Sequence, residues 1–170
     1  MMQMLAAGGM TLLTDYERKA DEDNPRGYCE WEPAKQLPKR PELIDQAEGK
    51  VVKVISQLLM SIPEGRDYKI VFMQRPLSEV LASQDEMLRR RGRTDNVDHE
   101  VMAKAFQDHL AKVSAWLKQR NLPVCFQGYR KVLNDPRGTA ETLRDFLGND
   151  LDVDGMVRQV DMSLYRNRST

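Results

Sequence analysis

The stretch YKIVFMQRPLSEVLASQ, residues 68–84, decides how the rest of the chain is interpreted. It opens with an apolar, β-branched run at 70–73, which has the length of a buried strand. Arg75 and Pro76 end that run, and Pro76 suits the first turn of a helix because it lacks an N–H group. From Ser78 onward apolar residues recur at roughly helical spacing. The stretch therefore predicts a strand, a tight turn and a helix.

The turn between that strand and that helix is a candidate anion site. The first N–H groups of a helix have no partner within the helix, so they are available to an anion. Arg75 lies where the strand ends, and Ser83 lies about two helical turns further on. A guanidinium group together with a hydroxyl is suited to holding a phosphate. The alternative is that Arg75 pairs with a carboxylate and Ser83 faces solvent.

Length and composition narrow the class of protein. At 170 residues the chain is predicted to form one domain spanning 1–170. The formal net charge is zero, which gives no broad electrostatic case for nucleic acid or an acidic membrane. The apolar runs are too short to span a bilayer, and residues 1–10 lack the features of a signal peptide. With only two cysteines and two histidines, the chain is predicted to be cytoplasmic, with reduced thiols and no zinc site.

Two further apolar runs, at 51–55 and 123–126, are strand candidates. Each is followed by a helical pattern, so the sequence predicts an α/β fold with a parallel sheet between helices. Lys53 interrupts the first run, and a buried ammonium group needs an anionic partner. The alternative is that Lys53 lies at a strand edge and extends its head to water.

Residues 24–32, NPRGYCEWE, combine a turn with two acidic residues. Glu30 or Glu32 is a candidate base for deprotonating an acceptor hydroxyl. The alternative is an exposed acidic loop beside two aromatic anchors. The next segment, 33–41, is rich in proline and lysine and is predicted to be a surface loop.

The stretch GYRKVLNDPRGTAETLRDFLG, residues 128–148, predicts a strand end, a short helix, a DP turn and a packed helix that Gly148 ends. A last helix is predicted within 152–160, and a helix at 1–9 ends at a glycine pair.

Three of these stretches together resemble the sulfotransferases that use 3′-phosphoadenosine 5′-phosphosulfate (PAPS). Arg75 followed eight residues later by Ser83 is similar to the family's 3′-phosphate-binding segment. The NPRGYCE string is similar to the "NP(K/R)G-aromatic-x-E" segment of bacterial sulfotransferase-like proteins, and residues 129–148 are similar to "Y-x-x-L-x-x-DP … L-x-x-FLG", although the first part reads Y-x-x-x-L-x-DP here. The resemblance spans nearly the whole chain. It implies a three-layer α/β/α fold of the P-loop type and transfer of a sulfuryl group to a hydroxyl or amine, on a small-molecule or carbohydrate acceptor.

The resemblance also implies roles for individual residues. Arg75 and Ser83 would hold the 3′-phosphate, and Lys53 would meet the bridge oxygen of the leaving group. Arg166, in the basic tail, is a further candidate for the 3′-phosphate. Many family members carry a catalytic histidine two residues after the lysine, but this chain has Ile55 there. Glu30 therefore becomes the candidate base, and the scheme needs no metal.

One part of the family pattern is absent from the sequence. The 5′-phosphosulfate loop, a glycine- and hydroxyl-rich turn with a basic residue, is not found in these 170 residues. We therefore expect that the sequence begins inside the family's first helix, without its first strand, and that this chain alone binds the cofactor weakly and turns over little. A natural start is the alternative. The alternative function is a non-catalytic nucleotide-binding or degenerate interaction module of the same fold, while a kinase-like enzyme would need a GK(S/T) loop that is also absent.

Overall fold

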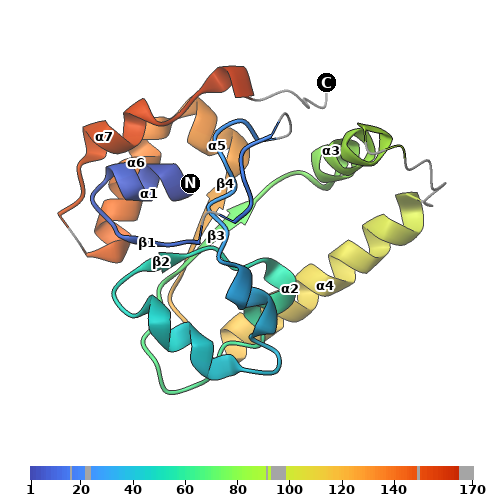
Figure 1. Ribbon diagram of the computed structural model, residues 1–170, viewed down its shortest axis with the longest axis horizontal. Coiled ribbons are helices and arrows are strands. Elements are labelled where there is room, and N and C mark those ends of the chain that lie inside the picture. The colour runs from blue at the N-terminus through green and yellow to red at the C-terminus, as the bar shows by residue number, and fades with distance from the viewer. Residues whose placement is uncertain (16, 22–23, 91, 93–98, 149, 165–170) are drawn as a thin grey trace.

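The computed structural model describes residues 1–15, 17–21, 24–90, 92, 99–148 and 150–164. Within them the chain is a mixed α/β protein with two short parallel sheets near its centre (Figure 1). The strands are β1 (Leu12–Leu13) paired with β2 (Val51–Val52), and β3 (Ile70–Gln74) paired with β4 (Val124–Gly128). The register places Leu12 opposite Val51 in the first sheet and Ile70 opposite Val124 in the second.

Helices surround these strands. The α-helices of the described residues are α1 (Met2–Ala7), α2 (Ser56–Leu59), α3 (Leu77–Arg90), α4 (His99–Gln119), α5 (Tyr129–Asn134), α6 (Pro136–Leu147) and α7 (Val153–Arg158). The 3-10 helices are η1 (Glu32–Gln36), η2 (Pro41–Ala47) and η3 (Met162–Leu164). No helix in the described part of the chain combines the length and the apolar character that crossing a membrane requires.

The predicted unit of strand, turn and helix at 68–84 is confirmed as β3 followed by α3. The Pro76 carbonyl accepts the N–H groups of Glu79 and Val80, at 3.0 and 3.1 Å, and so closes the first turn of α3. The expected burial of the strand is wrong, because β3 is only half-buried and Met73 is 37% exposed. Only one edge of β3 is covered by a strand among the described residues, namely by β4.

The strand prediction at 123–126 is confirmed by β4, whereas the one at 51–55 holds only for Val51–Val52. After Val52 the chain no longer pairs with β1, and Ile55 is 51% exposed. The partner of β2 is the two-residue strand β1, which the sequence did not reveal. In the described residues β2 and β3 are not paired, so the single parallel sheet that we expected is two separate sheets.

The segment at 33–41 corrects another expectation. It is not a surface loop throughout, since Glu32–Gln36 forms η1 and Leu37 is fully buried. Ala34 and Leu37 are three residues apart, which places both on one side of a 3-10 turn, where they join Trp31 in a hydrophobic cluster.

The C-terminal prediction is confirmed closely. Asp135 caps α6 by accepting a hydrogen bond from the Gly138 N–H at 2.9 Å, and Pro136 occupies the first helical position. Gly148 ends α6 with φ of 71°, a left-handed conformation that favours glycine. At the other end of the chain, α1 packs against α7 through Gly8, where a Cβ atom would lie 2.9 Å from Met156.

Two hydrophobic clusters form the core. The first is built from η1, η2, α2 and α4 and contains, among others, Trp31, Leu37, Ile44, Val113 and Leu117. The second is built from α1, β4, α5, α6 and α7 and contains, among others, Met4, Cys125, Val132, Leu143 and Met156. Figure 1 shows α1, α6 and α7 together on one side of the strands and α2 and α4 on the other.

Candidate functional site

A cavity of about 2740 Å³ opens between the two sheets and gathers most of the predicted site residues. Glu30, Lys53, Arg75 and Ser83 all line it, although they come from four separate parts of the chain. Arg166 lies outside the described residues.

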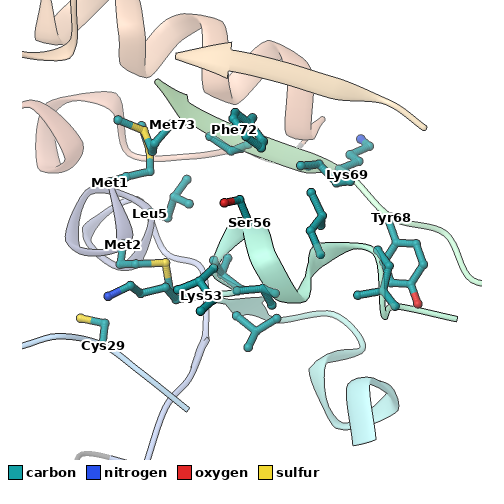
Figure 2. A pocket seen from close by; sticks show the side chains of 18 of the residues that line it. Met1, Met2, Leu5, Cys29, Lys53, Ser56, Tyr68, Lys69, Phe72 and Met73 are labelled. Atoms are coloured by element: carbon teal, nitrogen blue, oxygen red, sulfur yellow. The ribbon is translucent and has the colours of Figure 1, made fainter. Parts of the chain in front are cut away.

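The walls of the cavity come from both sheets. In Figure 2, Phe72 and Met73 of β3 lie on one side of the cavity, and Lys53 and Ser56, which follow β2, lie on the opposite side. The start of α1 also contributes, since Met1 and Leu5 line the cavity. The cavity is therefore bounded by segments that are far apart in the sequence.

The ends of the strands position the charged residues. Lys53 directly follows β2, Arg75 directly follows β3, and Arg130 is the second residue of α5, which begins where β4 ends. Because β3 and β4 are parallel, their carboxyl ends meet at the same edge of their sheet. Ligands of α/β proteins commonly bind outside such carboxyl ends.

Lys53 lies in a cluster with Glu30 and Arg18. Its ammonium group donates to Glu30 Oε1 and to the Tyr28 carbonyl, both at 3.1 Å. Arg18 Nη1 contacts Glu30 Oε1 at 3.3 Å, and its guanidinium lies 3.4 Å from the centre of the Tyr28 ring. The anionic partner that a lysine at this position needs is thus Glu30, the other predicted catalytic residue.

This cluster changes the character of Glu30. Partial burial acts to raise the pKa of Glu30, but the hydrogen bond and the charge of Lys53, together with the charge of Arg18, outweigh it. The pKa of Glu30 therefore lies below its ordinary value of 4.5. A carboxylate with a lowered pKa holds a proton less well, so it is a weaker general base.

Glu32, the alternative base, is placed elsewhere. It does not line the cavity, and it pairs with Lys35 at 2.6 Å on the surface. Of the two acidic residues, the structure brings only Glu30 to Lys53.

Arg75 belongs to a second cluster, centred on Glu79. Glu79 is 1% exposed, and its Oε2 accepts from Arg75 Nε at 3.0 Å. Its Oε1 accepts from Arg130 Nε at 2.7 Å and contacts Arg130 Nη2 at 2.5 Å. The Arg75 guanidinium also lies 5.0 Å from the centre of the Tyr129 ring. Arg75 therefore does pair with a carboxylate, while it also lines the cavity.

Ser83 is half-buried on α3 and lines the same cavity as Arg75. Both residues thus border one cavity.

Sequence reasoning missed Glu79 and Arg130. Glu79 follows Arg75 by four residues, a spacing at which side chains on a helix meet, so the pair was accessible to sequence analysis. Arg130 carried no such signal, because its contact with Glu79 depends on the pairing of β4 with β3.

The described side chains contain no group of three or more His, Cys, Asp or Glu residues suited to holding a metal ion. Cys29 and Cys125 are free, and His109 Nε2 lies 2.9 Å from Ser56 Oγ.

Comparison of the chain with protein-family models, with curated proteins and with solved structures found no significant match.

Proposed function

We propose that this chain is a sulfotransferase-like protein whose cavity holds the 3′-phosphate end of PAPS. The observation that carries the proposal is that Lys53, Arg75 and Ser83, the residues implied by the resemblance, line one cavity, although Lys53 follows β2 and the other two follow β3. When bound, PAPS would supply the activated sulfuryl group, and the acceptor would be a hydroxyl or amine on a small molecule or carbohydrate.

The charges of the two clusters suit a phosphate-bearing ligand. In one cluster Lys53 and Arg18 contact the carboxylate of Glu30. In the other, two arginines contact the carboxylate of Glu79. Cationic donors that are already held in place are favourable for phosphate, because less side-chain entropy is lost on binding.

Within this proposal Arg75 and Ser83 bind the 3′-phosphate, and Lys53 supplies positive charge to the opposite wall. Glu30 orients the ammonium group of Lys53 rather than acting as the base, since its pKa is lowered. Glu79 is a positioning residue, because it fixes the guanidinium of Arg75 at the end of β3.

The proposal includes a fold of three layers, α/β/α, of the P-loop type. It is supported by the way the side chains of β3 alternate between the two hydrophobic clusters. Ile70 and Phe72 of β3 pack against the first cluster, whereas Val71 packs against the second. Alternate residues of a strand point to opposite faces, so helices cover both faces of β3.

Calorimetry with adenosine 3′,5′-bisphosphate tests the nucleotide site. The informative variant is Arg75→Lys, which keeps a cation beside Glu79 but removes the planar fork that grips a phosphate. We expect it to weaken binding about three- to tenfold, since lysine keeps the charge and so loses only about half of the roughly 1.5–3 kcal/mol that a charge-assisted phosphate contact contributes. Ser83→Ala should weaken binding by a smaller factor, in the same direction.

A matched control is Arg66→Lys. Arg66 also lines the cavity and also pairs with a carboxylate, Asp45, but it precedes β3 and so lies away from that strand's carboxyl end. The Arg66→Lys variant should bind adenosine 3′,5′-bisphosphate with the same affinity as the unaltered protein. Equal affinity for adenosine 5′-monophosphate, or unchanged affinity in Arg75→Lys, would contradict the proposed site.

The second candidate function is a non-catalytic nucleotide-binding module. It is favoured by the absence of the 5′-phosphosulfate loop from these 170 residues. Binding of the bisphosphate without any transfer of labelled sulfate from PAPS to a phenol acceptor would support this second function over the first.

A further inference from the structure

The strands β2 and β3 each have one edge without a strand partner among the described residues. In the second sheet the Ile70 N–H donates to the Pro123 carbonyl at 3.0 Å, so Ile70, Phe72 and Gln74 turn their backbone groups toward β4. Because these groups alternate along a strand, those of Val71 and Met73 point the other way. In the first sheet the Val51 N–H donates to the Thr11 carbonyl at 2.9 Å, so the backbone groups of Val52 point away from β1.

The two sheets share the same two hydrophobic clusters. Val52 of β2 packs against the first cluster and Val51 against the second. The same alternation occurs in β3, where Phe72 packs against the first cluster and Val71 against the second. Each cluster therefore covers one face of both sheets, which indicates that the sheets are parts of one layer interrupted between β2 and β3.

The cavity occupies that interruption. Its lining includes the unbroken runs 47–57 and 65–75, which contain β2 and β3, whereas the described residues of β1 do not line it. A volume of about 2740 Å³ is well above the roughly 300–1,000 Å³ typical of small-molecule pockets. Four strand residues at its border are only half-buried, although their strands belong to the core: Val51, Val52, Ile70 and Phe72.

We propose that the gap between β2 and β3 binds one extended, apolar polypeptide segment that hydrogen-bonds to both strands and joins the two sheets. A backbone strand is the occupant that meets both needs of the gap. It supplies N–H and C=O groups to two facing edges, and its alternating side chains complete the two clusters. No described residue supplies this segment, which spans about the five residues of β3 and carries neither proline nor charge in its centre.

Amide exchange measured by NMR tests this with a synthetic peptide, acetyl-KVIVIVK-amide, as the probe. We expect exchange at Val52, Val71 and Met73 to slow by about tenfold or more, because these amides face the gap. Exchange at Ile70 and Phe72 should change little when the peptide binds, because their amides already form hydrogen bonds to β4. The two sets of amides within one strand thus control for each other.

A peptide of the same length with prolines at its third and fourth positions is the control, since backbone groups alternate along a strand and proline cannot donate to a ladder, so the peptide loses a donor toward each edge of the gap. It should leave all these amides unchanged. Protection of one edge alone, equal slowing of both sets, or no slowing at all would each overturn the proposal. Joining the segment to Met1 by a flexible glycine-serine linker raises its effective concentration to about the millimolar range, so weak affinity for the free peptide does not conceal binding.

This inference does not depend on the nucleotide site. The exchange experiment is done without nucleotide, and Arg75→Lys should leave the peptide's effect on Val71 unchanged. Failure of peptide binding and failure of bisphosphate binding are therefore separate results.

Discussion

Arg130→Ala is the substitution whose effect on stability the structure specifies most sharply. Arg130 provides Glu79 Oε1 with contacts at 2.7 and 2.5 Å, while Arg75 provides Oε2 with one at 3.0 Å. The Glu79 side chain is 0% exposed. Removing Arg130 therefore takes two contacts from a buried carboxylate.

The magnitude follows from burial. Removing one partner of a fully buried ion pair costs about 3–5 kcal/mol, because the other charge is left uncompensated. Here Arg75 remains, and the Arg130 side chain is 47% exposed, so part of its charge is already screened by solvent. We therefore expect a loss of about 2 kcal/mol in the free energy of unfolding, which lowers Tm by about 4–8 °C in a chain of this size.

Thermal and urea denaturation followed by circular dichroism measure this loss. Arg137→Ala is the matched control, because Arg137 also contacts a carboxylate, Asp154, at 2.5 Å, but with side chains that are 59% and 64% exposed. It should leave Tm nearly unchanged, because an exposed ion pair contributes little to stability. Equal losses of Tm in the two variants would refute the reasoning, because it attributes the stabilisation to burial of the ion pair and not to the distance between its atoms. Arg130→Lys should recover about half of the loss by restoring one charge.

Two further predictions concern single carboxylates. Because the pKa of Glu30 is lowered in the folded protein, its ionised form stabilises the fold above the ordinary pKa of 4.5. Glu30→Gln should therefore be less stable than the unaltered protein at pH 7, and urea titrations should show the difference shrinking as the pH falls below 4.5; a difference that grows toward low pH would contradict the ion pair. Asp135→Ala removes the cap of α6 and should cost about 1 kcal/mol in the same assay, whereas Asp135→Asn should cost little, since asparagine also caps helices; equal losses would show that the hydrogen bond to Gly138 contributes nothing.

The elements that the sequence predicted well are those with local signals. Pro76 after an apolar run marked the change from β3 to α3, and Asp135, Pro136 and Gly148 marked both ends of α6. Each of these residues acts through its own backbone or through an N–H group a few positions away, so the cause of the structure lies within the stretch itself.

The candidate site was predicted only in part for the same reason. Arg75 and Ser83 were selected by the end of a strand and the helix after it, and Lys53 by its place inside an apolar run; all three line one cavity. The ion pair between Lys53 and Glu30 joins residues 23 positions apart, and no local pattern links them. It lowers the pKa of Glu30, an effect that sequence reasoning did not anticipate.

Sequence alone determined that the chain alternates strands and helices and that Arg75 follows a strand end. Tertiary structure decided which strands pair, that Leu12–Leu13 is a strand at all, and that Glu79 is shared by two arginines. A two-residue strand has no periodicity to detect and exists only because β2 lies beside it. Strand pairing and buried ion pairs depend on contacts between distant residues, whose free energy no single stretch of sequence carries.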